Sequence, residues 1–326
     1  MPINRRDFLK ITALTGAVLG LSATTTNLLL NNGSLHKIAE THYLMGTVVN
    51  FVLLAESSEK AKTAIRTTVD EMQRLIRLFD YRHVESPLGQ LNAVGITRQA
   101  GPELINILQQ AKRFGELSNG AFDITIKPML DVLKANLPMD LVDRACVDYR
   151  KINIDKNEIS FARPGMALTL DGLAKGGVVD AGVAILQGLG FEDVLVEAGG
   201  DMMARNAHAE KPWNIGIAHP RVQGEILAEI SISNQAVATS GDYLNYFSSD
   251  YSRHHILDPR TGASPSELAS ATVIAASVLE ADALSTTMMV LGAKAGLALI
   301  ESLPTTAVLL VSKDMQIYRS SKFPVG

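Results

Sequence analysis

The chain has 326 residues, of which 47% are apolar and 20% charged, with a formal net charge of −4 and one cysteine. The high apolar fraction excludes a disordered chain, and one cysteine excludes an intrachain disulfide framework, so we expect a folded protein with a large core. The mild negative charge, with no basic block longer than Arg5-Arg6, excludes the positive face that nucleic-acid binding needs. We therefore expect no nucleic-acid partner.

The first residues have the pattern of an export signal. Arg5-Arg6 precede Phe8-Leu9-Lys10, an apolar stretch follows at 11–21, and a mostly polar run ends near Ser34. An apolar stretch of about 11 residues is too short to cross ~30 Å of hydrocarbon as a helix, which argues against a membrane anchor. The paired arginines resemble a twin-arginine signal. We expect residues 1–34 to be this signal and a short linker, with an amphipathic first helix or an uncleaved signal anchor as the alternatives.

Hydrophobic patterning along residues 35–326 predicts one mixed α+β unit. A strand is predicted from Thr47 to Leu54 and an amphipathic helix from Ser57 to Asp80. Another helix begins at Gly101-Pro102, since proline is tolerated in the first turn of a helix, and ends near Asn119-Gly120. The remaining predicted elements are strands at 151–154, 167–170, 194–197, 213–218, 227–231, 236–239, 271–275 and 307–311, and helices at 175–189, 279–291 and 293–301. Because strands and helices do not alternate regularly, the order indicates α+β rather than a parallel βαβ fold.

Two glycine-containing stretches are candidate binding loops for a planar, phosphate-bearing ligand. In the first, Gly120-Ala121 leaves backbone N–H groups approachable, and Phe122 and Asp123 follow with a ring and a carboxylate. A helix C-cap followed by a strand is the alternative there. The second runs from Leu170 to Gly177, where small residues open a helix N-terminus to an anion and Lys175 adds a positive charge. It lacks the P-loop spacing, and a tight glycine turn is its alternative.

Two further stretches carry charged groups after predicted strands. The run Glu197-Ala198-Gly199-Gly200-Asp201 is a glycine turn that is equally a hairpin connection. Later, His255 is a candidate proton acceptor near neutral pH and Arg260 a candidate phosphate partner. A routine turn at Asp258-Pro259 and a solvated histidine pair are the alternatives.

A fifth candidate is a pair of oxygen ligands on one helix. Asp282 and Thr286 are separated by four residues, so their side chains project from the same face one turn apart. Such hard oxygen ligands suit Mg²⁺, which fills the rest of its shell with water and ligand phosphates. The alternative is a helix-start acid with a threonine that faces a neighbouring strand. The sequence contains no His/Cys cluster for zinc and no nucleophile elbow.

Read in order, these stretches resemble the flavin transferases of the ApbE family, which move FMN from FAD onto a protein threonine. The resemblance covers residues 45–286 and rests on five matching stretches. These are Met45-Gly46-Thr47, Gly120 to Thr125, Leu173 to Gly176 with Asp180 after it, His255 to Gly262, and Ala281 to Thr286. It implies a fold of mainly antiparallel sheets packed with helices, and a Mg²⁺-dependent transfer that releases AMP.

The resemblance also implies roles for individual residues. The residues implied to contact FAD are Met45, Tyr81, Ala121, Phe122, Asp123 and Lys175. Mg²⁺ would be held by the backbone carbonyl of Gly172 and by Asp282 and Thr286, while His255 matches the family's histidine near the reacting phosphate. The sequence departs from the family at Thr169, where Asp is usual, and at Asp171, where Gly is usual. We assign both positions to the FAD site, with the acidic group moved across the strand.

Two other functions would use the same residues. One is a Mg²⁺-dependent FAD pyrophosphatase that produces FMN and AMP, with water in place of threonine. The other is a non-catalytic flavin-binding factor for the maturation of an exported redox complex. For the transferase, the expected partners are FAD and an FMN-binding redox subunit that carries the target threonine. We expect the protein in the periplasm or on the outer side of the cell envelope, with membrane association only through the signal or the acceptor.

Overall fold

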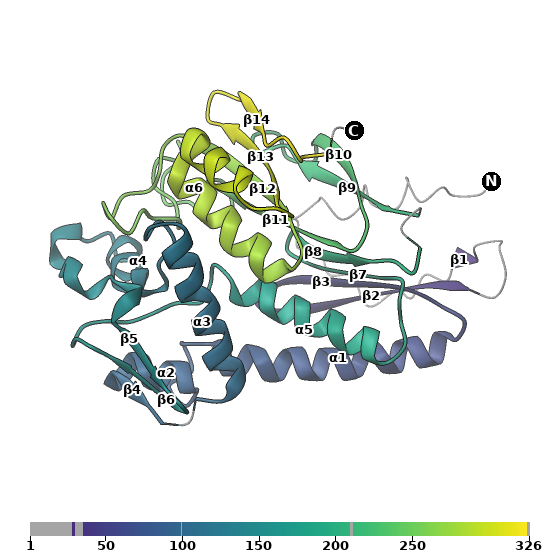
Figure 1. Ribbon diagram of the computed structural model, residues 1–326, viewed down its shortest axis with the longest axis horizontal. Helices are drawn as coiled ribbons and strands as arrows, with labels where there is room; N and C mark the ends of the chain where they lie inside the picture. Colours follow the sequence, from purple (N-terminus) through teal and green to yellow (C-terminus); the bar gives the residue numbers. More distant parts are fainter. Residues whose placement is uncertain (1–27, 30–34, 99, 209–210, 325–326) are drawn as a thin grey trace.

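A large antiparallel sheet forms the centre of the protein (Figure 1). The computed structural model describes residues 28–29, 35–98, 100–208 and 211–324, so the predicted export signal lies almost entirely outside the described residues. The sheet has nine strands in the order β1-β2-β3-β7-β8-β11-β12-β13-β14, and every neighbouring pair is antiparallel. The strands are β1 (Leu28–Leu29), β2 (His36–Leu44), β3 (Thr47–Ala55), β7 (Val194–Ala198), β8 (Asp201–Arg205), β11 (Gln235–Gly241), β12 (Leu268–Ala275), β13 (Ala307–Ser312) and β14 (Ile317–Arg319). The expectation of a mixed fold with mainly antiparallel sheets is confirmed.

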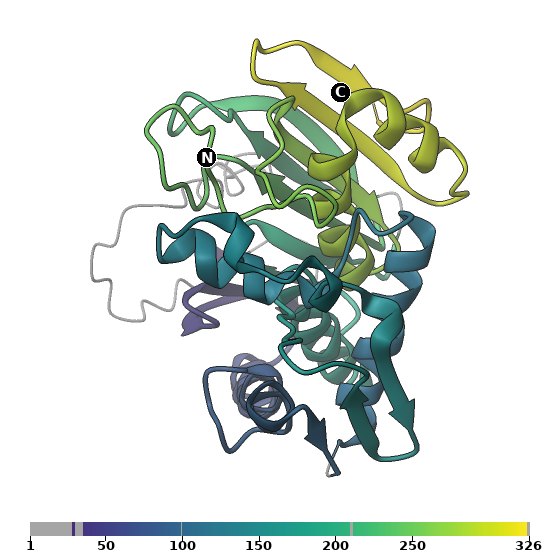
Figure 2. The same ribbon diagram turned by 90° about the vertical axis from the view of Figure 1, so that its left-hand side faces the viewer.

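Helices cover one face of this sheet and a two-stranded hairpin covers the other. Helices α1 (Ser58–Phe79), α5 (Ala174–Gly188) and α6 (Val278–Glu301) pack side by side on the first face, as Figures 1 and 2 show. The hairpin of β9 (Trp213–Ala218) and β10 (Ile226–Ile232) packs on the second face. Successive strand residues point to opposite faces, so Phe51 joins the helix-side core while Val52 joins the hairpin-side core. Burial on both faces explains the nearly continuous apolar runs of the central strands.

A smaller set of elements, between residues 87 and 161, lies at one end of the sheet (Figure 1). It contains α2 (Pro87–Val94), α3 (Pro102–Leu117), α4 (Lys127–Lys134) and a three-stranded sheet of β4 (Ile96–Thr97), β6 (Glu158–Phe161) and β5 (Ile152–Asp155). Four short 3-10 turns, at Ile124–Ile126, Met139–Leu141, Arg144–Cys146 and Tyr149–Lys151, connect these elements. This region contributes the Gly120–Asp123 loop to the site.

Helix α6 is the core helix of the fold. Ser277 caps its start by accepting the Glu280 N–H at 3.2 Å, and Gly292 breaks it with φ 75° and ψ −178°. At this break the Glu267 carboxylate accepts the Ala293 N–H at 2.9 Å, which restarts the helix. The two helices predicted on either side of Gly292 are confirmed, and together they make up α6 with a kink at this glycine. Within the described residues α6 is the helix long and apolar enough to span a membrane, but most of its apolar stretch is buried against β11, β12 and α5.

The predicted strand at 167–170 is wrong. This segment is extended but belongs to no sheet, because its backbone groups bond to other partners. The Leu168 N–H donates to Asn92 Oδ1 at 2.8 Å, and the Thr169 N–H donates to the Ile124 carbonyl at 2.9 Å. The segment thereby holds the Gly120–Asp123 region against the start of α5.

Candidate active site

Four segments that are distant in the sequence meet at the N-terminal end of α5. They are the loop after α3, the segment from Thr169 into α5, the β7–β8 hairpin, and the first turns of α6. Gly172 shows how closely three of the predicted residues approach, because a methyl group placed on its Cα would lie 3.2 Å from Phe122 Cε2 and 3.6 Å from Thr286 Oγ1. The absence of a side chain at Gly172 therefore keeps the space between the ring and the hydroxyl open.

Asp282 lies beside this space on the first turns of α6. Its side chain is 6% exposed, and Oδ2 accepts the Gly176 N–H at 3.2 Å. One turn further, Thr286 Oγ1 is 3.3 Å from Ser240 Oγ, which is also 2.8 Å from Ser285 Oγ. Burial raises the pKa of Asp282 to about 7, and the negative charge of Asp201 adds to the rise.

Lys175, in the first turn of α5, forms an ion pair with the buried carboxylate of Asp201. Asp201 begins β8 directly after the Gly199-Gly200 turn, where both glycines have positive φ and Ala198 pairs with Asp201 across the hairpin. The hairpin alternative for this stretch is therefore correct. Sequence reasoning did not assign Asp201 to the site; the signal was a two-glycine hairpin turn that returns the chain to the same sheet edge.

The buried carboxylate of Glu197 stabilises this hairpin turn through hydrogen bonds. Its Oε1 accepts the Gly200 N–H at 2.6 Å, and its Oε2 accepts from Asn50 Nδ2 at 2.6 Å. Burial raises the pKa of Glu197, while these two hydrogen bonds favour the ionised form. Both carboxylate oxygens are thus committed to protein donors.

These residues fit a divalent cation. In the described part of the chain, the buried carboxylates of Asp282, Asp201 and Glu197 surround one ammonium group, that of Lys175. Burial is the main cause of the raised pKa of Asp282 and the charge of Asp201 the second, so a cation bound to this carboxylate would favour its ionised form. The oxygen donors of Asp282, Thr286 and the Gly172 carbonyl match the ligand preference of Mg²⁺.

A second group of predicted residues forms a charged rim around Tyr81. Two cations contact the Tyr81 ring, with Arg82 Cζ at 4.6 Å and Lys127 Nζ at 4.8 Å from its centroid. Asp171 is exposed, and its Oδ2 is 4.0 Å from Arg82 Nη2. Thr169 is buried behind it, where Oγ1 accepts the Asp171 N–H at 3.2 Å. The carboxylate of Asp171 therefore lies at the exposed rim, whereas position 169, where the family usually has Asp, lies in the interior.

The structure gives Asp123 an internal role. One oxygen accepts from Thr125 N at 2.8 Å and Thr125 Oγ1 at 2.6 Å, and the other accepts from Tyr149 N at 2.9 Å. Burial raises the pKa of Asp123, and the hydrogen bonds act in the opposite direction. The carboxylate orders the loop that carries Phe122, and an FAD contact by Asp123 stays a prediction.

Other predicted residues lie in well-defined local structures. Ala121 and Phe122 are buried, and the Phe122 ring packs edge-on to Phe114 with centroids 6.1 Å apart. Met45, with φ 54°, forms the β2–β3 turn. The Gly199 N–H donates to the Val48 carbonyl at 3.2 Å, so the β2–β3 strands lie directly beside the hairpin that carries Asp201.

His255 lies on the long connection between β11 and β12. Its Nδ1 is 3.1 Å from the Asn245 carbonyl, which assigns the proton to Nδ1 and leaves Nε2 as an acceptor. Burial lowers the pKa of His255 to about 4, so the ring is neutral at physiological pH. The negative charge of Asp171 opposes the effect of burial on the pKa of His255 and adds to the rise in the pKa of Asp282.

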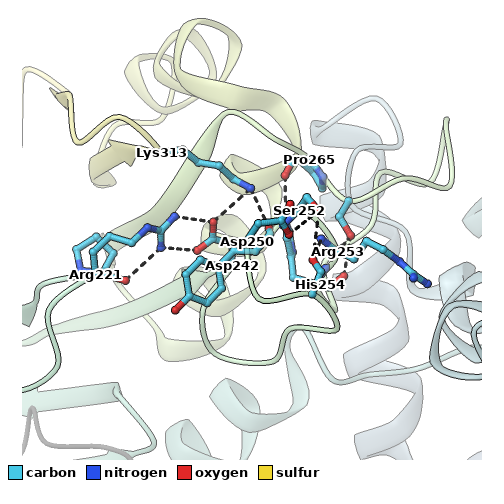
Figure 3. A network of polar contacts seen from close by, with 12 residues as sticks. Arg221, Asp242, Asp250, Ser252, Arg253, His254, Pro265 and Lys313 are labelled. Carbon is cyan, nitrogen blue, oxygen red and sulfur yellow. Dashed lines mark hydrogen bonds and ion pairs between the residues drawn. The ribbon is translucent and has the colours of Figure 1, made fainter.

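An ion-pair network anchors the connection that carries His255 (Figure 3). The fully buried carboxylate of Asp242 accepts from Arg221 Nη1 and Nη2 at 2.7 and 2.8 Å, and Lys313 Nζ lies at 3.5 Å. Next to His255, the buried His254 bonds through Nε2 to the Pro265 carbonyl at 3.0 Å. Asp242, at the start of the connection, is thus bound to Arg221 in the β9–β10 turn and to Lys313 after β13, and His254 within the connection is bound to Pro265 near its end.

The connection also packs against α4. Leu257 joins a small apolar cluster with Met129, Leu130 and Leu133. Arg260, a candidate phosphate partner, instead holds Asp258 through Nε and Nη2 at 2.8 Å each. Its guanidinium is thus bonded to the Asp258 turn, and contact of Arg260 with a phosphate stays a prediction.

Comparison with known proteins gives a consistent assignment. Residues 45–310 match the model of the ApbE family. The FAD:protein FMN transferase of Vibrio cholerae is 29% identical over 300 residues, covering 86% of this chain and 89% of that protein. The FAD:protein FMN transferase of Haemophilus influenzae is 30% identical over 280 residues, covering 80% of this chain and 81% of that protein.

Solved structures give the same result. The ApbE protein of Thermotoga maritima superimposes with a TM-score of 0.79 at 30% identity, covering 88% of this chain and 98% of that chain. The flavinyl transferase ApbE of Pseudomonas stutzeri, in its apo form, has a TM-score of 0.79 at 27% identity, covering 90% and 97%. Sequence and fold agree over nearly the whole described chain, and the protein belongs to the ApbE family.

Proposed function

We propose that this protein transfers FMN from FAD to a threonine hydroxyl of an acceptor protein and releases AMP. The observation that carries the proposal is the convergence of Phe122, Gly172, Asp282 and Thr286 beside the start of α5. The two relatives described above are both named FAD:protein FMN transferase, which supports the same reaction.

In the proposed reaction, the acceptor oxygen forms a bond to the FMN-side phosphorus of FAD, and the bond from this phosphorus to the AMP oxygen breaks. The hydroxyl proton goes to Nε2 of His255, which is neutral and has its other nitrogen held by the Asn245 carbonyl. Phosphoryl transfer depends mainly on positioning and on the stabilisation of charge. The N-terminus of α5 supplies positive potential for this purpose, and the ammonium of Lys175 offsets part of the negative charge of the carboxylates around it.

Mg²⁺ is the proposed metal, held by Asp282, Thr286 and the Gly172 carbonyl. When bound, it would neutralise charge on the pyrophosphate. The support is the set of oxygen donors and the buried excess of carboxylates around Lys175.

The test is an assay of products. The protein is incubated with FAD, MgCl₂ and the flavin-free form of an FMN-carrying redox subunit, and both AMP and fluorescent protein bands are measured. The proposal predicts a covalent band and an equal amount of AMP, both lost when the acceptor threonine is changed to valine. AMP without a band would instead indicate FAD hydrolysis, and neither product would indicate a binding protein.

We also propose that the protein is exported to the periplasm or the outer side of the cell envelope. The support is the Arg5-Arg6 pattern and the apolar stretch at 11–21. Replacing both arginines with lysine and fractionating cells tests this, since retention of the wild-type distribution would contradict a twin-arginine route.

A further inference from the structure

Lys175 lies within reach of more than one carboxylate, and we propose that Asp201 is a positioning residue that binds the Lys175 ammonium and so keeps Asp282 available for a divalent cation. This inference rests on the metal site of the proposed function. It concerns a residue that contacts neither FAD nor the metal in the proposed reaction.

Of the two nearby aspartates, Asp201 forms an ion pair with Lys175 and Asp282 does not. The Lys175 ammonium is bonded to Asp201 Oδ2, and Asp201 Oδ1 accepts the Thr239 N–H at 3.3 Å. Asp282 interacts electrostatically with both Lys175 and Asp201, yet among the described residues it forms no ion pair. Within the described part of the chain, the one hydrogen bond to its carboxylate is the long contact from the Gly176 N–H at 3.2 Å.

The ion pair of Lys175 with Asp201 leaves the Asp282 carboxylate available for a divalent cation. Asp201 is 1% exposed and Asp282 is 6% exposed, so neither is stabilised by bulk water. The Lys175 ammonium is half-buried and is stabilised by a carboxylate partner, and the carboxylate that takes this role is neutralised and occupied. A lysine bonded to Asp282 would compete directly with a cation for the same oxygens.

Without Asp201, Asp282 is the remaining partner for Lys175. Glu197 also acts on Lys175 electrostatically, but its two oxygens accept from Gly200 N and Asn50 Nδ2, at 2.6 Å each. Loss of the Asp201 charge is therefore expected to transfer the ammonium to Asp282.

The backbone holds Asp201 in the place that this role requires. Asp201 pairs with Ala198 across the two-glycine turn, and its Oδ1 is tied to Thr239 on β11. A carboxylate on the central sheet is a rigid partner, whereas Asp282 stands on a helix that faces the open space at Gly172.

A double-mutant cycle tests the inference. Mn²⁺ binding is titrated by electron paramagnetic resonance for the wild type, Asp201→Asn, Lys175→Met and the double variant, in the absence and presence of saturating FAD. We expect Asp201→Asn to weaken Mn²⁺ binding at least tenfold when Lys175 is present and less than threefold when position 175 is Met. The methionine background is the matched control, because it removes the competing ammonium and keeps the Asp282 carboxylate in place. The FAD-free titration decides the comparison, since Lys175 is also an expected FAD contact.

Three results would overturn the inference. Equal losses in both backgrounds would show that Asp201 acts through its own charge or as a ligand, and no loss in Asp201→Asn would show that Lys175 does not move. If Asp201→Asn does not yield folded protein, Asp201→Ser removes the same charge and serves in the same cycle. A wild type that binds no Mn²⁺ would reject the metal site itself, together with this inference, while covalent transfer in the product assay would still stand as a separate result.

Discussion

The carboxylate of Asp180 on α5 accepts the backbone N–H of Val278 at 2.8 Å, and so joins α5 to the first turn of α6. The other oxygen accepts the Leu279 N–H at 2.9 Å. These N–H groups have no partner within the helix, so a side chain from another helix completes the cap that Ser277 begins. Since Asp282 follows within the next turn, this contact sets the position of the metal candidate relative to Lys175.

Replacing Asp180 with alanine should destabilise the protein by about 2–3 kcal/mol, because two buried N–H groups lose their acceptor. Urea unfolding followed by circular dichroism measures the change. Ser277→Ala is the control, with an expected loss of about 1 kcal/mol from a single cap hydrogen bond. Equal losses in the two variants would contradict a special role for the contact between the helices.

The Asp242 network predicts a link between stability and catalysis. Asp242→Asn should cost about 2–3 kcal/mol, because Arg221 and Lys313 lose the fully buried charge between them. It should also lower the transfer rate more than it weakens FAD binding, because the connection that carries His255 is released. Flavin fluorescence for binding and AMP release for turnover separate the two effects.

The matched control for this variant is Arg260→Gln in the same connection. Arg260 forms an exposed pair with Asp258, so its loss should change stability by less than about 1 kcal/mol. A similar loss in Asp242→Asn would show that the buried network does not anchor the connection.

The depressed pKa of His255 predicts a specific pH dependence of stability. The folded ring has a pKa of about 4, against 6.5 for an unperturbed histidine, so below pH 6.5 the unfolded chain takes up a proton that the folded protein does not. This contribution to stability is complete above pH 6.5 and is lost as the pH falls toward 4. When the pH falls from 7 to 4.5, the free energy of unfolding of the wild type should decrease by about 1–2 kcal/mol more than that of His255→Asn, as urea unfolding at each pH measures. Asparagine is chosen because it keeps a donor toward the Asn245 carbonyl. Parallel losses for the two proteins would show that His255 is not buried in its neutral form.

The sequence predicted the elements whose apolar pattern is local. Helix α1 and strand β3 lie within a residue or two of their predicted bounds, because their buried faces follow the periods of 3.6 and 2. Strand β2 was missed because it is only half-buried and carries polar residues on both faces. Helix α4 was missed because its eight residues are stabilised by Leu257, which is more than 120 positions away in the sequence.

In the site, too, the sequence predicted the features that depend on local spacing and missed those that depend on long-range contacts. The spacing of Asp282 and Thr286 placed them on one face, and the glycine at 172 marked a close approach. The pairing of Lys175 with Asp201 depends on how β8 lies beside α5, which no local pattern encodes. Asp123 was assigned to ligand binding although an Asp two residues before a threonine is also the pattern of a side-chain cap on the following turn, which is what the structure has.

Asp282→Asn should raise the stability of the metal-free protein and abolish the function of the site, so the two effects of this carboxylate can be measured separately. Burial and the charge of Asp201 raise the pKa of Asp282 to about 7 from 3.8, so at pH 8 the ionised carboxylate destabilises the folded metal-free protein. Asparagine keeps an oxygen for the Gly176 N–H without the charge, and the metal-free variant should be more stable than the wild type by about 1–3 kcal/mol at pH 8. The gain should shrink toward pH 5, where the wild-type carboxylate is protonated.

The same variant should lose both the thermal stabilisation by MgCl₂ and the transfer activity, because a ligand that binds only the folded state stabilises it in proportion to its affinity. Thermal unfolding with and without MgCl₂, in the presence of FAD, measures the first effect, and AMP release measures the second. An Asp282→Asn protein with the same MgCl₂-dependent rise in Tm as the wild type would place the cation elsewhere. If metal-free Asp282→Asn is less stable than the metal-free wild type, Asp282 is a structural residue. A buried carboxylate whose role is to bind a cation should instead destabilise the folded protein when the cation is absent.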